Sequence, residues 1–134
     1  MYKTYGYLRY SPQINGSWDR RDGGTTRWWL IIDAENEIGK YYRKLYWYTN
    51  FVTLQNPAWG THVSLIRGET PPDAALWKKY DGKRIEFEYD PDADCNDTYF
   101  WLPVRCPEAS EIRKELGLTP YPRFHYHLTF GNTK

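Results

Sequence analysis

The chain has few of the residues and segments that mark several common classes of protein. Two cysteines, Cys95 and Cys106, occur in 134 residues, too few for a disulfide framework or a paired-cysteine metal site, so we expect free thiols. The longest apolar run, Trp28–Ile32, is far shorter than the ~18 residues that a membrane span needs. Residues 1–5 contain no apolar signal region. We therefore expect a soluble, cytoplasmic protein.

An excess of positive charge is also absent. The formal net charge is +1, which argues against a protein that follows a long phosphate backbone and favours a small anionic ligand held in one local pocket. Aromatic residues are abundant instead, with 7 Trp and 13 Tyr. Much of this aromatic surface must be core, and the rest is suited to stacking on bases.

Two segments share a pattern built around a histidine, although the chain has only 3 histidines. Segments 59–66 and 126–131 each contain a histidine, an apolar residue, a hydroxyl residue and another apolar residue. Their alternation predicts β-strands. Side chains two apart share one face of a strand, which groups His62 with Ser64 and His127 with Thr129. If the strands are neighbours, two imidazoles and two hydroxyls meet in one small space.

The remaining pattern predicts one domain, residues 1–134, of the α+β class. Further strands are expected at 4–10, 51–54, 83–89 and 98–104, and helices at 34–49, 73–80 and 107–116. The apolar run 28–32 is expected to be either a buried strand or the lead-in to the first helix. An apolar stripe on the first helix, formed by Ile38, Tyr41, Tyr42, Leu45 and Tyr48, is expected to pack on a sheet. The motif histidines are 127 − 62 = 65 residues apart, about half the chain, which favours a pseudo-twofold arrangement.

The paired motifs resemble those of the two-histidine (2H) phosphoesterase superfamily. Within this superfamily, the chain resembles the phage anti-CBASS nuclease branch over most of its length. The resemblance lies in five segments: Tyr5–Tyr7, Ile38–Tyr42, Trp59–Glu69, Ile112–Leu118 and His127–Gly131. It implies antiparallel sheets that form a central cleft with helices packed outside. It also implies cleavage of cyclic di- or trinucleotide messengers of a bacterial antiviral system, in the host cytoplasm if a phage encodes the chain.

The expected chemistry needs no metal or other cofactor. One neutral imidazole takes the proton of a ribose 2′-hydroxyl, and the other, protonated, gives a proton to the departing 5′-oxygen of a 3′–5′ phosphodiester. The catalytic residues are then His62 and His127, with Ser64 and Thr129 donating hydrogen bonds to the non-bridging oxygens. The residue types do not decide which histidine is the base.

Residues that hold the substrate are expected around the motifs. By the resemblance, Tyr10 and Trp77 stack on bases, although a core role fits each of them equally. Arg67 and Glu69 follow the first motif and are expected to contact phosphate or a base edge, unless they form a surface ion pair. Arg20 and Arg21, in the polar loop 13–26, are expected to approach a phosphate or to be solvated.

Other interpretations stay open at this stage. The same motifs fit an enzyme that opens 2′,3′-cyclic phosphates at RNA ends, or a module that binds cyclic nucleotides without cleaving them. A zinc site from His62, His125 and His127 with a carboxylate is a further alternative, although the spacing does not support it. Without it, His125 is a strand-entry or rim residue. We expect a monomer or a small homo-oligomer with no membrane partner.

Overall fold

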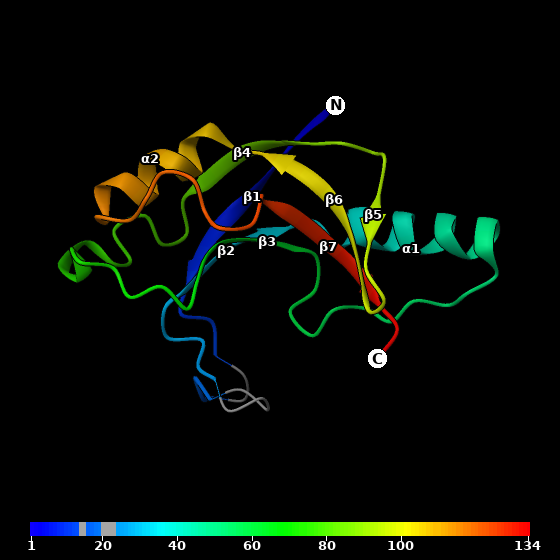
Figure 1. The fold of residues 1–134 in the computed structure, drawn as a ribbon, viewed down its shortest axis with the longest axis horizontal. Helices are drawn as coiled ribbons and strands as arrows, with labels where there is room; N and C mark the ends of the chain where they lie inside the picture. The colour runs from blue at the N-terminus through cyan, green and yellow to red at the C-terminus, as the bar shows by residue number, and fades with distance from the viewer. Residues whose placement is uncertain (14–15, 20–23) are drawn as a thin grey trace.

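The computed structural model describes residues 1–13, 16–19 and 24–134 (Figure 1). Arg20 and Arg21 lie outside these described residues. The elements, in chain order, are β1 (Tyr2–Tyr10), β2 (Trp29–Ala34), α1 (Asn36–Asn50), β3 (His62–Arg67), a 3₁₀ turn (Ala74–Leu76), β4 (Arg84–Tyr89), β5 (Asp94–Cys95), β6 (Tyr99–Arg105), α2 (Pro107–Glu115) and β7 (His127–Asn132).

The strands of the described residues form one antiparallel sheet in the order β4-β1-β2-β3-β7-β6-β5. A short pairing between β4 and β6, Glu88 with Arg105 and Tyr89 with Val104, joins the two sides of this sheet. Six strands therefore close into an antiparallel barrel, with β5 attached to β6.

The expected α+β fold, in which antiparallel sheets form a central cleft with helices outside, is wrong. The described part of the chain is mostly sheet, with two short helices beside the closed barrel. Alternation of side chains reports which face of a strand is buried, but it carries no information on which strands pair at the ends of a sheet. The pairing of β4 with β6 is therefore not visible in the sequence.

The core explains why most of the expected strands form. Most strands bury the apolar residues of one face in a common core, where residues such as Leu8, Val63, Phe87 and Leu128 are at most 2% exposed. The strands expected at 4–10, 83–89 and 98–104 are confirmed with small shifts of their ends, and so are both motif strands. Of the two alternatives for 28–32, the structure has the strand, β2. Residues 51–54 form no strand, and the helix expected at 73–80 is a single 3₁₀ turn.

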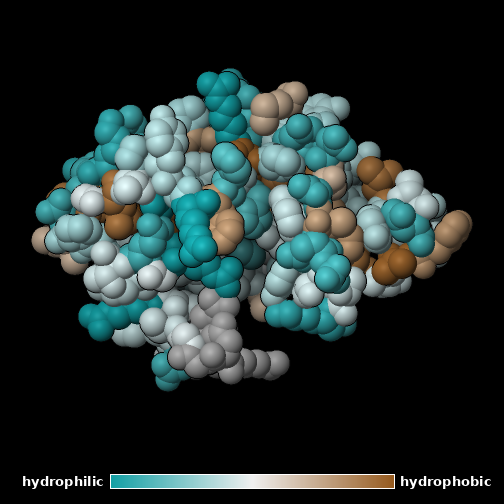
Figure 2. Space-filling view, in the orientation of Figure 1, coloured by the Kyte–Doolittle hydropathy of each residue, from teal (hydrophilic) through white to brown (hydrophobic). Residues whose placement is uncertain are grey.

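Helix α1 packs on the sheet with a narrower face than its sequence suggests. Tyr42 is buried, and Ile38 and Tyr46 pack against the core. Tyr41, Leu45 and Tyr48 were expected in the same stripe, but they are 59%, 43% and 59% exposed. Figure 2 shows apolar side chains at the right end of the molecule, where the C-terminal part of α1 lies in Figure 1. The apolar stripe is therefore wider than the surface that the sheet covers.

The first turn of α1 holds the start of the first motif strand. The Asn36 side chain accepts a hydrogen bond from the backbone N–H of Thr61 at 3.1 Å. Gly39 lies so close to this segment that a Cβ there would be 2.3 Å from the Thr61 hydroxyl oxygen. Since Thr61 directly precedes His62, α1 fixes the point at which the motif strand begins.

The structure also bears on the cysteines and on the length of the apolar helices. Cys95 and Cys106 are both free thiols, as predicted. No helix in the described ranges combines the length and the apolar character that crossing a membrane requires.

Candidate functional site

The two motif strands, β3 and β7, are antiparallel neighbours. His62 lies opposite Thr129, and Val63 lies opposite Leu128. Continuing this register by one residue sets Ser64 opposite His127. Each histidine therefore faces the hydroxyl residue of the other motif, and we call His62, Ser64, His127 and Thr129 the quartet.

The quartet lies on the side of the sheet that faces away from the core. Val63 and Leu128, which alternate with the quartet residues, are fully buried in the core. Residues directly opposite each other in a sheet share a face, so all four quartet side chains point the other way. Ser64, His127 and Thr129 are half-buried, whereas His62 is only 8% exposed.

The two histidines are diagonal neighbours in this register. The backbones of such neighbours are about 7–8 Å apart, a separation that two imidazole side chains on the same face can span. The charge of His127 acts on the titration of His62, which also indicates that the rings are close. The juxtaposition expected from the motifs is therefore present in the fold.

Both imidazoles are held in the same way by the backbone. Nδ1 of His62 lies 2.9 Å from the carbonyl oxygen of Gly60, and Nδ1 of His127 lies 2.9 Å from that of His125. A carbonyl only accepts hydrogen bonds, so Nδ1 carries the proton in both rings. Each Nε2 is then the atom that can accept a proton from a ligand, or donate one when the ring is charged.

Gly60 makes this contact possible at the first motif. Its φ of +71° is in the left-handed region, and a Cβ there would lie 2.7 Å from the Asn36 side-chain oxygen. The turn through Gly60 points its carbonyl at the histidine two residues later. His125 supplies the matching carbonyl at the second motif through its backbone, while its own side chain is exposed.

Two tryptophans enclose the quartet from the neighbouring strands. Trp29 of β2 lies 5.6 Å from the His62 ring, centroid to centroid, and its indole N–H donates to the Ser64 hydroxyl oxygen at 2.9 Å. Trp101 of β6 pairs with Thr129 in the sheet, and its ring lies 5.6 Å from that of His127. Because Trp29 is the donor to Ser64, the hydroxyl proton of Ser64 is left for a ligand oxygen.

Sequence reasoning missed both of these tryptophans as site residues. Trp29 reads as part of a buried apolar run, and Trp101 as part of an aromatic strand. Only the strand order, with β2 beside β3 and β6 beside β7, shows that they flank the motifs. The abundance of tryptophan in the chain was the one available indication.

Burial lowers the pKa of His62 below its usual value of 6.5. The positive charges of Arg67 and His127 act in the same direction, whereas the Gly60 hydrogen bond and the Asp33 carboxylate oppose the shift. Asp33 lies opposite His62 on β2 and forms an ion pair with Arg9 at 3.4 Å. His62 is therefore neutral at neutral pH, with Nε2 ready to accept a proton.

The lowered pKa of His62 predicts acid-sensitive folding. Below about pH 6.5 the imidazole of the unfolded chain becomes protonated, whereas that of folded His62 is still neutral. The contribution of His62 to the free energy of unfolding is therefore fully present above that pH and is lost as the pH falls through the folded pKa. The slope from this group is at most about 1.4 kcal/mol per pH unit. Urea unfolding between pH 7.5 and 5 should show a smaller slope for His62→Asn than for the wild type, and equal slopes would contradict the assignment.

Tyr10 and Trp77 lie together, but on the core side of the sheet. Tyr10 is 5% exposed and belongs to the core, and its ring meets that of Trp77 edge-on at 5.0 Å between centroids. The Trp77 indole N–H donates to the Ser11 hydroxyl oxygen at 2.9 Å. The structure does not bring this pair to the quartet, because Tyr10 points to the opposite face of β1.

Arg67 and Glu69 have different surroundings. The Arg67 guanidinium lies 5.4 Å from the centre of the Trp29 ring, and its charge acts on His62, so it stands at the edge of the quartet. Glu69 instead binds the buried Arg113 guanidinium with both carboxylate oxygens, each at 2.8 Å. Glu69 is thus held by α2 and not directed to the quartet.

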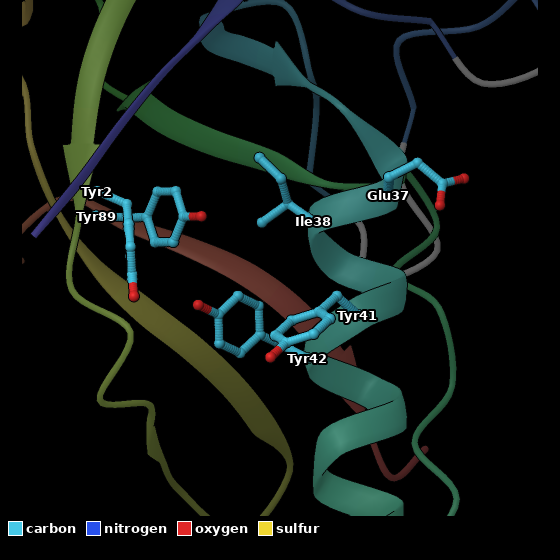
Figure 3. Close-up of a pocket in the computed structure, with 6 residues that line it drawn as sticks. All are labelled: Tyr2, Glu37, Ile38, Tyr41, Tyr42 and Tyr89. Atoms are coloured by element: carbon cyan, nitrogen blue, oxygen red, sulfur yellow. The ribbon is translucent and has the colours of Figure 1, made fainter.

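In the described part of the chain, the quartet coincides neither with a cluster of metal ligands nor with the hollow beside α1. Within residues 1–13, 16–19 and 24–134, no group of three or more His, Cys, Asp or Glu side chains is arranged to hold a metal ion. The hollow drawn in Figure 3 lies beside α1, and none of its lining residues belongs to the quartet. The quartet itself is a surface site flanked by tryptophans.

Comparisons with family models, curated proteins and solved structures found no match. Assignment of a function therefore depends on the motifs and on the geometry of the quartet.

Proposed function

We propose that the chain is a phosphodiesterase that cleaves 3′–5′ bonds of cyclic di- or trinucleotides by paired-histidine acid–base catalysis. The observation that carries the proposal is the register of β3 and β7, in which each motif histidine faces the hydroxyl of the other motif. The formal net charge of +1 also fits a compact anion better than a long polynucleotide.

In the proposed reaction His62 is the general base and His127 the general acid. Nε2 of His62 takes the proton of the 2′-hydroxyl, and the 2′-oxygen forms a bond to phosphorus. The bond from phosphorus to the 5′-oxygen breaks, and that oxygen receives a proton from Nε2 of His127. The products are a 2′,3′-cyclic phosphate and a free 5′-hydroxyl. The low pKa of His62 supports this division, because its base form dominates at neutral pH.

The hydroxyl residues stabilise the charge that develops on the non-bridging oxygens. Thr129 lies opposite His62, and the same register places Ser64 opposite His127. Ser64 receives the Trp29 indole hydrogen bond, so its own proton is directed to an acceptor such as phosphate. Trp101 and Trp59 are half-buried beside the quartet and offer ring surface to a base.

The biological role in this proposal rests on the resemblance of the motifs. In the anti-CBASS branch, cleavage of cyclic nucleotides by a phage enzyme removes a host antiviral signal. We extend that role to this chain as part of the same proposal.

The test is direct cleavage. Purified protein is incubated with cyclic GMP-AMP in EDTA, and products are separated by chromatography. Linear products in EDTA support the proposal, whereas intact substrate across several cyclic di- and trinucleotides contradicts it. Two further arms separate the alternatives: turnover only of RNA with a 2′,3′-cyclic phosphate end indicates RNA-end processing, and binding without turnover indicates a sequestering module.

A further inference from the structure

A hollow lined by tyrosines lies between α1, the N-terminal end of β1 and the C-terminal end of β4, and it contains no quartet residue. Its volume is about 350 Å³, and Figure 3 shows its lining side chains, which are Tyr2, Glu37, Ile38, Tyr41, Tyr42 and Tyr89. Four of these six residues are tyrosines, contributed by three separate elements. Nothing in the proposed phosphodiesterase reaction uses them.

The rings form walls at steep angles to one another. Tyr41 and Tyr42 meet at 86° with centroids 5.0 Å apart, and Tyr42 and Tyr89 meet at 89° with centroids 6.2 Å apart. Tyr2 leans on Tyr89 at 5.7 Å with a 38° tilt. Rings at these angles turn their π-faces in more than one direction, and the faces that are not covered by a neighbouring ring edge remain available to a ligand.

Much of this aromatic surface is open to solvent. Tyr2 is 58% exposed and Tyr41 is 59% exposed, whereas Tyr42 is 7% exposed and forms the floor. Burial, reinforced by the neighbouring tyrosines, raises the pKa of Tyr42 to about 12, so its phenol stays neutral at physiological pH. Two exposed rings standing over a buried one are not explained by core packing.

The charge of the hollow is negative. Its one charged lining residue is Glu37, which stands one helical turn before Tyr41, and no lining residue is Lys or Arg. Glu37 has no ion-pair partner within the described part of the chain. Figure 3 shows its carboxylate directed away from the tyrosine rings, so Glu37 adds a nearby negative charge and not a wall of the hollow. Ring faces and a nearby carboxylate both attract a cation.

A second hollow along the same helix has the opposite character. It is lined by Lys40, Arg43 and Lys44 together with Trp47, Tyr48, Thr53 and Leu54. Three cations there repel a positive ligand. The two hollows therefore differ in charge although both contain aromatic rings, and only the tyrosine hollow suits a cation.

We propose that the tyrosine hollow binds an organic cation that carries a methylated ammonium group. A methylated ammonium is bulky and weakly hydrated, so it can leave water for a mostly aromatic surface, whereas a plain ammonium is compact and strongly hydrated. Tyr41, Tyr42 and Tyr89 supply the ring faces, and Glu37 supplies a nearby negative charge. This site is independent of the proposed phosphodiesterase reaction.

The test compares choline with 3,3-dimethyl-1-butanol, which has the same shape without the charge. Titrations of the wild-type protein are followed by NMR of the tyrosine rings. We expect choline to bind at least about twofold more tightly than the neutral alcohol, since the cation–π contribution amounts to roughly 0.5–2 kcal/mol, or about 2- to 30-fold. Equal binding of the two, or binding of neither, overturns the proposal.

Variants locate the site. Tyr41→Leu removes an exposed ring and should weaken choline binding at least about twofold, while Tyr41→Phe keeps the ring face and should bind as the wild type does. Tyr48→Leu is the matched control, because Tyr48 lies on the same helix with the same 59% exposure but outside the hollow. Glu37→Gln should weaken choline and leave the alcohol unchanged.

Other outcomes are equally decisive. If Tyr41→Leu leaves choline binding unchanged, the hollow is not the site. If Tyr48→Leu weakens choline as much as Tyr41→Leu does, the effect is not specific to the hollow. If adenosine binds and choline does not, the rings serve a neutral base, and the cation assignment is wrong.

Discussion

Replacing His127 with alanine is expected to slow cleavage of a cyclic dinucleotide by about 100- to 10,000-fold, the usual contribution of one acid–base group. The imidazole is half-buried on the face of β7 that points away from the core, so its removal takes away the proposed acid without opening a core cavity. The rate is measured under single-turnover conditions with wild type and variant side by side. A variant that retains more than about a tenth of the wild-type rate contradicts a role as general acid.

His125→Ala is the matched control for this prediction. His125 supports His127 through its backbone carbonyl, and alanine retains that carbonyl. We therefore expect near wild-type cleavage, with circular dichroism spectra and melting temperatures of both variants close to those of the wild type. A loss of activity in His125→Ala equal to that in His127→Ala, together with a wild-type activity that EDTA abolishes and added zinc restores, would instead favour the three-histidine metal site.

The sequence contains the local part of this site. Alternation in segments 59–66 and 126–131 predicts two strands with a histidine and a hydroxyl on one face, and β3 and β7 have that form. The shared face follows from the two-residue repeat of a strand, which needs no tertiary information. Pairing of His62 with Thr129 follows from the register of two strands far apart in sequence, and no pattern within either strand specifies it.

The surroundings of the site were less predictable for the same reason. Trp29 and Trp101 flank the quartet because β2 and β6 are the outer neighbours of the motif strands. Tyr10 was expected at the substrate, yet its position on β1 turns it into the core. Each of these outcomes depends on strand order and on which face a residue takes, and neither is written in residue types alone.

Helix α1 shows another limit of predicting burial from the spacing of apolar residues. A three- and four-residue apolar repeat predicts that α1 buries one side, and Tyr42 does so. Tyr41 belongs to the same repeat but stands in solvent and lines the tyrosine hollow. An apolar position that lines a surface hollow has the same sequence pattern as one that packs in the core, so only the tertiary structure distinguishes them.

Glu69 illustrates how a residue expected at a ligand can instead belong to the framework. Its carboxylate is held by Arg113 of α2, whose side chain has no exposed surface. The same guanidinium donates to the carbonyl oxygens of Leu65 at 3.0 Å and Thr119 at 2.8 Å. Arg113 therefore ties the end of α2 to the end of the first motif strand and to the segment that leads toward β7.

Arg113→Met is expected to lower the free energy of unfolding by about 2–3 kcal/mol, mostly from the loss of hydrogen bonds to buried backbone carbonyls, because the Glu69 side chain is 40% exposed and water can solvate its charge. Methionine fills similar space but donates no hydrogen bond, so the two carbonyl acceptors lose their partner. Lys114→Met is the control, because the neighbouring Lys114 side chain is 55% exposed and only forms a surface pair with Glu111 at 3.6 Å. It should change stability by less than about 1 kcal/mol.

Urea unfolding of the wild type and both variants provides the measurement. A domain of this size has a total stability of about 5–15 kcal/mol, so the loss in Arg113→Met is a large share of it and should also loosen the first motif strand. Total activity is then expected to fall in proportion to the unfolded fraction while the molecules that stay folded keep their activity, because Arg113 contacts the strand end and not the quartet. If Arg113→Met unfolds at the same urea concentration as Lys114→Met, the buried guanidinium does not hold α2 to β3, and the strand register must be maintained by the sheet alone.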